Sequence, residues 1–90
     1  MPRATVIIPT HRRAPYLEVA LASIGPQARA AGAGVLVVDD GGDPDTQAVA
    51  RRHGADLVVL EPARGLNAAR NAAAAHTGAE LLAYVDDDVR

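Results

Sequence analysis

Four short apolar runs alternate with longer segments of helical character along the 90 residues of the chain. The apolar runs are continuous rather than alternating with polar residues, which is typical of strands buried on both faces of a parallel sheet. The order βαβαβαβ then predicts a doubly wound α/β fold with right-handed crossovers. The predicted strands are 5–8, 35–38, 56–60 and 81–85.

The three segments between these runs carry helix signals. The first helix is predicted over 14–24, because Pro15 suits its first turn and apolar residues recur at helical spacing. Gly25-Pro26 predicts its end, with one further turn over 27–31. The second and third helices are predicted to begin at the capping sequence 43–46 and at Leu66, and to end near His53-Gly54 and at His76.

Polar residues follow three of the predicted strands directly. The sequence PTH at 9–11 follows the first strand, DDGG at 39–42 the second and DDD at 86–88 the fourth. Ligands of open parallel sheets bind at the carboxyl ends of the strands, which share one edge. We therefore expect these segments to build a single cleft.

The acidic run at 86–88 is a candidate metal site. In an extended strand end, Asp86 and Asp88 project to one face and Asp87 to the other. Two such carboxylates can hold a hard divalent cation and leave coordination positions for a diphosphate. The metal would stabilise charge on a diphosphate leaving group during glycosyl or phosphoryl transfer. The alternative is a solvated acidic tail or the cap of a further helix.

The other candidate groups also have plainer interpretations. A carboxylate after the second strand can accept from a base N–H or from ribose hydroxyls, and the glycines after it let the backbone approach a ligand. A polar turn leading into a helix explains the same residues. Arg70, one turn into the third helix, offers a planar fork of donors to base carbonyls or phosphate. An exposed arginine on a surface helix is the commoner alternative.

Composition narrows the range of functions. A net charge of −2 gives no electrostatic basis for binding nucleic acid or an anionic membrane. The lack of cysteine excludes disulfides and fits a reducing compartment, so we expect a cytoplasmic protein. Neither a signal peptide nor an apolar run of about 20 residues is present, so we expect no transmembrane segment.

Taken together, these segments resemble the N-terminal, nucleotide-binding half of family 2 glycosyltransferases with the GT-A fold. The resemblance rests on four blocks in the family's order and at its spacing, which are VIIPTHRR at 6–13, VVDDGG at 37–42, GLNAARN at 65–71 and DDD at 86–88. It implies a Rossmann-like sheet of about four parallel strands in the order 3-2-1-4. It also implies an inverting transfer from a nucleotide-diphosphate sugar.

The resemblance implies a role for each matching residue near the base. Pro9 and Thr10 would line the base pocket, with His11 where the family usually has an aromatic side chain. Asp40 and Arg70 would contact the base, typically uracil. A UDP-sugar is therefore the expected donor, whereas the acceptor is left open.

The acidic run takes the remaining roles in this resemblance. Asp86 and Asp87 would contact ribose and diphosphate. Asp88 would bind Mn²⁺ or Mg²⁺ as the last carboxylate of a DXD motif, with Asp86 as a second metal ligand. The family's catalytic base is a carboxylate far downstream, and the chain ends at Arg90. We therefore expect residues 1–90 to form one nucleotide-sugar-binding domain, truncated after the DXD motif and lacking the base.

Other folds fit the sequence less well. A receiver domain needs a lysine, which the chain lacks, and an acidic pair after its first strand. A dinucleotide-binding domain needs a glycine-rich turn where residues 9–12 stand. A rival of another class is a non-catalytic nucleotide-binding or interaction module of the same fold, whose exposed sheet edge would favour a homo-oligomer.

Overall fold

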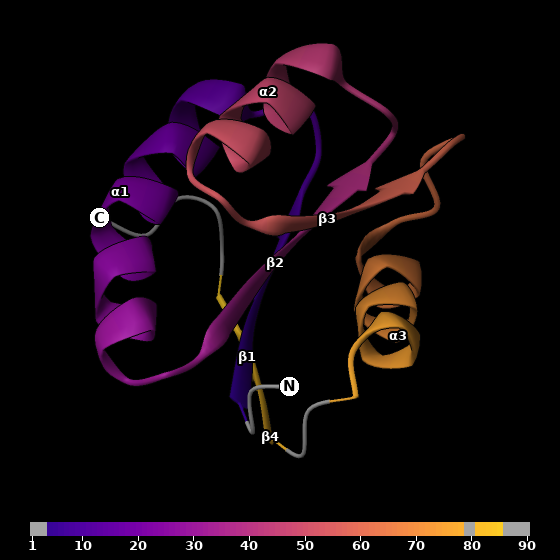
Figure 1. The fold of residues 1–90 in the computed structure, drawn as a ribbon. Coiled ribbons are helices and arrows are strands. Elements are labelled where there is room, and N and C mark those ends of the chain that lie inside the picture. Colours follow the sequence, from indigo (N-terminus) through magenta and orange to yellow (C-terminus); the bar gives the residue numbers. More distant parts are fainter. Residues whose placement is uncertain (1–3, 79–80, 86–90) are drawn as a thin grey trace.

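The computed structural model describes residues 4–78 and 81–85 of the chain. Four strands form one sheet in the order β3-β2-β1-β4, and every neighbouring pair is parallel (Figure 1). This confirms the expected fold class and strand order. The strands are β1 (Ala4–Thr10), β2 (Gly34–Asp40), β3 (Asp56–Leu60) and β4 (Leu81–Tyr84).

Three helices cover the two faces of the sheet. Helices α1 (Ala14–Ala30) and α2 (Pro44–Arg52) lie on one face, and α3 (Leu66–His76) lies on the other (Figure 1). This arrangement follows from right-handed connections between parallel strands. Within the described residues, none of these helices is long and apolar enough to cross a membrane.

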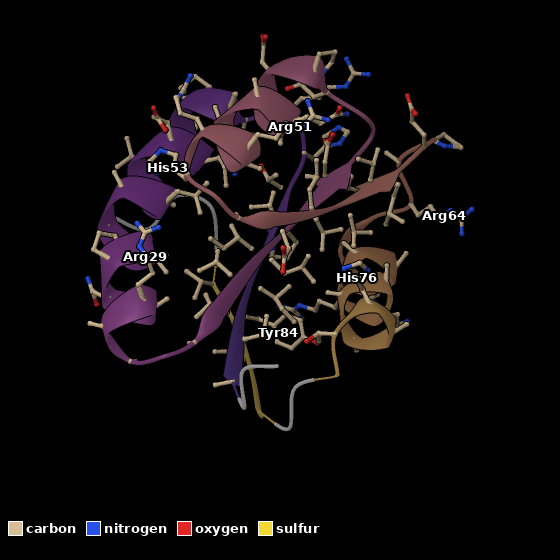
Figure 2. All side chains as sticks on the ribbon, in the orientation of Figure 1. Arg29, Arg51, His53, Arg64, His76 and Tyr84 are labelled. Atoms are coloured by element: carbon tan, nitrogen blue, oxygen red, sulfur yellow. The ribbon has the colours of Figure 1, made fainter. Side chains whose placement is uncertain are left out.

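The alternation of side chains along each strand divides the core into two layers. Ile8 and Val37 pack with apolar residues of α1 and α2. Ile7 and its neighbours on β2 pack instead against Ala69 and Ala73 of α3. Tyr84 pairs in register with Ile7 and lies on this α3 side of the sheet (Figure 2). The α3 layer is therefore the thinner one, since alanine buries little apolar surface.

Helix α1 continues through the point where the sequence predicts its end. The expected stop at Gly25-Pro26 is wrong, because the helix runs on to Ala30. Proline removes one helical hydrogen bond and displaces its neighbours. The side-chain amide of Gln27 donates to the Ser23 carbonyl at 3.1 Å, which adds one hydrogen bond to this turn. Ala28, just beyond the proline, is buried, so tertiary packing favours a continuous helix.

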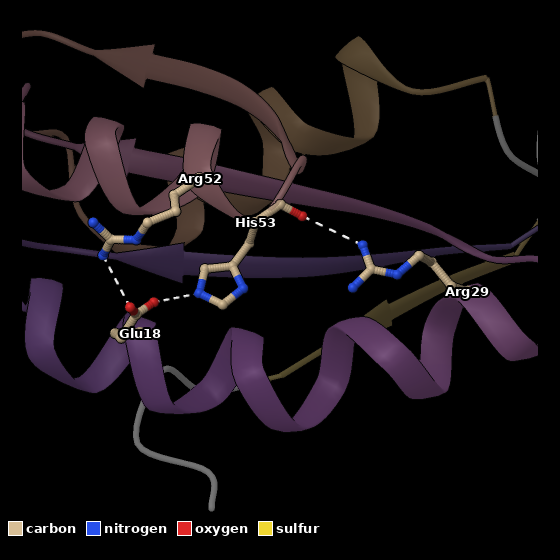
Figure 3. A network of polar contacts seen from close by, with 4 residues as sticks. All are labelled: Glu18, Arg29, Arg52 and His53. Carbon is tan, nitrogen blue, oxygen red and sulfur yellow. Dashed lines mark hydrogen bonds and ion pairs between the residues drawn. The ribbon is translucent and has the colours of Figure 1, made fainter.

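A polar network joins α1 to α2 on the outer side of the fold (Figure 3). Glu18 accepts a hydrogen bond from Arg52 at 2.9 Å and another from the ring of His53. Arg29 Nη1 lies 3.5 Å from the backbone carbonyl oxygen of His53. The His53 hydrogen bond is the main cause that lowers the pKa of Glu18, and the charges of His53 and Arg52 add to it.

The lowered pKa of Glu18 gives a pH-dependent contribution to stability. A carboxyl group with a lowered folded-state pKa stabilises the fold above its unfolded pKa and loses this effect as the pH falls through the folded value. Just above about pH 5, the Glu18 carboxyl group is ionised in both the folded and the unfolded chain, and we expect Glu18→Gln to reduce the free energy of unfolding by a constant amount. At each lower pH the reduction should be smaller. Urea unfolding at a series of pH values from neutral to acidic measures this, and a difference that does not shrink in acid would contradict the assignment.

Stability should depend strongly on the layer that packs against α1 and α2. Ile8 is fully buried there, so Ile8→Val should lower the free energy of unfolding by about 0.5–1.5 kcal/mol. Val19 on α1 is 45% exposed, so Val19→Ala should change it by less than about 0.5 kcal/mol. Urea unfolding of both variants tests this, and equal losses would show that this layer is not a packed core.

Candidate functional site

The loops after β1, β2 and β3 meet at one edge of the sheet. Thr10 pairs in register with Asp39, and Asp39 pairs with Val59, so the three strands end at the same level. The N–H of Gly41 donates to the Leu60 carbonyl at 2.7 Å and holds the second loop against the third. Loops 11–13, 41–43 and 61–65 lie together at this end of the sheet, where the strands finish. We call this end the carboxyl edge, as distinct from the lateral edges formed by β3 and β4.

Asp40 lies at the centre of the carboxyl edge. It is the last residue of β2 and only 6% exposed. Its two carboxylate oxygens accept the backbone N–H groups of Arg64 at 2.7 Å and Gly65 at 2.9 Å. Gly65 directly precedes α3, so Asp40 fixes the point where that helix begins. Each oxygen keeps lone-pair capacity for one more donor.

His11 also lies at this edge, and its ring is tied down. Its Nδ1 is 2.5 Å from the backbone carbonyl oxygen of Asp40. Gly41, with a φ of +121°, lies directly beneath the ring, since a Cβ atom at that position would be 3.2 Å from two ring atoms. The backbone here approaches the imidazole as only glycine permits.

Pro9 and Thr10 occupy the end of β1, as expected, but they face opposite sides of the sheet. Pro9 follows Ile7 on the α3 side, and Thr10 follows Ile8 on the side of α1 and α2. Thr10 is 4% exposed. Pro9 therefore shares its face with the side chain of Asp40, which continues the α3-facing row of β2.

Arg70 is half-buried on α3, and its guanidinium carbon lies 5.3 Å from the ring centre of Tyr84. This distance is that of a cation–π contact. Its Nε atom is buried and has no hydrogen-bond partner in the described part of the chain. A buried donor without an acceptor is costly, so the described contacts leave the Arg70 guanidinium incompletely paired.

Asp39 is a structural residue whose specific role the sequence does not reveal. It is fully buried, and its Oδ2 accepts the N–H of Asp43 and the side-chain amide of Gln47, both at 2.9 Å. The hydroxyl of Thr46 donates to the Asp43 carboxylate at 2.8 Å. Asp39 therefore fixes the start of α2, in agreement with the plainer interpretation of the DDGG segment as a turn that leads into a helix.

The predicted metal ligands Asp86 and Asp88, together with Asp87, lie outside the described residues. The N–H of Val85 donates to the Ile7 carbonyl at 2.9 Å, so the pairing of β4 with β1 extends to Val85. Within residues 4–78 and 81–85, no three histidine or acidic side chains gather as a metal site. The metal site at 86–88 stays a prediction.

Comparison with known proteins identifies the family. Residues 5–90 match the family described as glycosyl transferase family 2. The chain belongs to this family. No curated protein sequence matches it significantly.

Solved structures of glycosyltransferases have the same fold. A mannosyltransferase from Pyrobaculum calidifontis, in complex with GDP-Man and Mn²⁺, is 30% identical with a TM-score of 0.79 over 97% of this family 2 chain. S. aureus TarS is 27% identical with a TM-score of 0.76 over 98% of it. Glucosyl-3-phosphoglycerate synthase from Mycobacterium tuberculosis, solved with Mn²⁺ and UDP, is 22% identical with a TM-score of 0.82 over 96% of it and supports the fold alone. The chain spans 28%, 17% and 33% of these three proteins.

The contacts of Asp40 predict that its substitution destabilises the fold even when no ligand is bound. Asp40→Asn keeps one acceptor oxygen but turns an amide N–H₂ toward the other backbone N–H. We expect the free energy of unfolding to fall by about 1–3 kcal/mol, because a buried donor loses its partner. Urea unfolding without nucleotide measures this. Asp56→Asn, the same change at an exposed strand start, is the control, and an Asp40→Asn variant as stable as this control would contradict the assignment.

Proposed function

We propose that residues 1–90 form the donor-binding domain of an inverting glycosyltransferase that uses a nucleotide-diphosphate sugar. The observation that carries this proposal is the meeting of three loops around Asp40, in a chain of glycosyl transferase family 2. A solved structure 30% identical to the chain holds GDP-Man and Mn²⁺. Its GDP-Man supports a nucleotide sugar as the ligand of the carboxyl edge.

The α3 side of the carboxyl edge suits a nucleotide. Pro9, the Asp40 carboxylate and Arg70 all lie on the α3 face of the sheet, and Arg70 brings a planar set of donors. This guanidinium can donate to a base carbonyl or to phosphate. Asp40, held by two backbone N–H groups, can still accept from a base N–H. We propose a UDP-sugar as the donor, with a GDP-sugar as the first alternative to test.

The metal would be held by carboxylates next to the described end of β4. Asp86 and Asp88 offer oxygen donors, which suit both Mn²⁺ and Mg²⁺. The bound metal would neutralise charge on the diphosphate leaving group. We propose Asp88 as the principal ligand and Asp87 as a contact to ribose or diphosphate.

No buried carboxylate described at this edge is suited to act as the catalytic base. An inverting transfer needs a base within hydrogen-bond reach of the acceptor hydroxyl. Asp39 is fully buried and already bonded to Asp43 and Gln47. The Asp40 carboxylate already accepts two backbone N–H groups and is assigned here to the base of the nucleotide. We therefore propose that the base and the acceptor site belong to sequence outside residues 1–90. A cytoplasmic location and self-association through a sheet edge stay predictions.

The test is calorimetric titration of the chain with a UDP-sugar and with GDP-mannose, each with and without Mn²⁺. We expect Mn²⁺ to tighten binding of the preferred donor. Asp88→Ala should weaken the affinity measured with Mn²⁺ at least about tenfold. Asp45→Ala, which removes the same charge from the exposed first turn of α2, should keep the full gain. Equal affinities with and without Mn²⁺ in the wild type would rule out the metal assignment.

A further inference from the structure

His11 connects two of the loops at the carboxyl edge. Its ring belongs to the loop after β1, and its Nδ1 bonds to the carbonyl of Asp40 at the end of β2. A carbonyl oxygen only accepts hydrogen bonds, so Nδ1 must carry the proton. The neutral imidazole is therefore fixed as the Nδ1–H tautomer, with the lone pair on Nε2.

The ring orientation is fixed as well. The imidazole covers Gly41, where even a methyl group would stand 3.2 Å from the ring, and the β-carbon of Ala63 lies 3.7 Å from the same point. Residues from all three loops thus meet around Gly41. One face of the ring is occupied by backbone, while the residue as a whole remains exposed.

A continuous set of contacts leads from His11 to α3. His11 bonds to the backbone of Asp40, and the Asp40 carboxylate bonds to the N–H groups of Arg64 and Gly65. Gly65 is followed by the helix that carries Arg70. The position of the loop after β1 relative to Arg70 therefore depends on one imidazole hydrogen bond and two carboxylate hydrogen bonds.

We propose that His11 is a positioning residue of the nucleotide site, acting through its Nδ1–H bond to Asp40 rather than as a stacking surface for the base. This inference rests on the proposed nucleotide-binding function. Two substitutions separate the hydrogen-bond donor of the side chain from its aromatic ring. Phenylalanine keeps the ring without the donor, and asparagine keeps a donor near the position of Nδ1 without the ring. The two substitutions should therefore have opposite outcomes under the positioning and stacking roles.

The first measurement needs no ligand. Ring-nitrogen NMR shifts of the chain report which nitrogen of His11 carries the proton at a pH where the ring is neutral. We expect the Nδ1–H form, although the free side chain favours Nε2–H. A predominant Nε2–H form would overturn the proposal whether or not the chain binds nucleotides.

The second measurement is the affinity for the preferred nucleotide sugar with Mn²⁺. We expect His11→Phe to weaken binding about threefold to tenfold, the net worth of one hydrogen bond, and His11→Asn to recover most of the wild-type affinity. The reverse order, with phenylalanine near wild type and asparagine weak, would establish stacking and overturn the proposal. If the wild type binds no nucleotide, the proposed function fails, whereas the tautomer still decides whether His11 bridges the loops.

Discussion

The carboxylate of Asp40 joins the end of β2 to the start of α3, and the candidate site depends on this connection. Two backbone N–H groups converge on one buried side chain at 2.7 and 2.9 Å. Charge-assisted bonds of this kind are stronger than those between neutral groups. They place the start of α3 against the end of the sheet, and Arg70, about one turn further along the helix, contacts Tyr84 of β4. Further described support for α3 on the sheet comes from the alanine-based core layer and from the contact of Arg70 with the ring of Tyr84 on β4.

The two buried aspartates organise different parts of the carboxyl edge. Asp39 faces α1 and α2 and fixes the start of α2, whereas Asp40 faces α3 and fixes the start of that helix. The alternation of side chains along β2 makes this division possible, because neighbouring residues point to opposite faces. Gly41 and Gly42 follow at positive φ angles of 121° and 73°, which lets the chain turn closely beneath His11 and beside Glu61. A short DDGG segment thus positions three loops and two helices.

Much of this fold can be predicted from the sequence. Continuous apolar runs identify the strands, and the resemblance to the family gives their order. The end of α1 cannot be predicted from Gly25-Pro26, because the burial of Ala28 in the folded chain outweighs the local effect of proline. The contacts of Asp40 with Arg64 and Gly65 are equally invisible in the sequence, since residues 24 and 25 positions apart meet only through the strand register. The roles of Asp86, Asp87 and Asp88 remain expectations from the resemblance.

Backbone amide NMR can show whether a nucleotide sugar binds at the carboxyl edge of the sheet. Titration of the labelled chain with a nucleotide-diphosphate sugar and Mg²⁺ should shift the amide signals of His11, Gly41, Gly65 and Arg70. Signals around the hollow of about 190 Å³ at the opposite edge, lined by Arg29, His53 and Ala55, should stay unchanged. Shifts confined to that opposite hollow, or no shifts at a high nucleotide concentration, would show that a nucleotide sugar does not bind at the carboxyl edge.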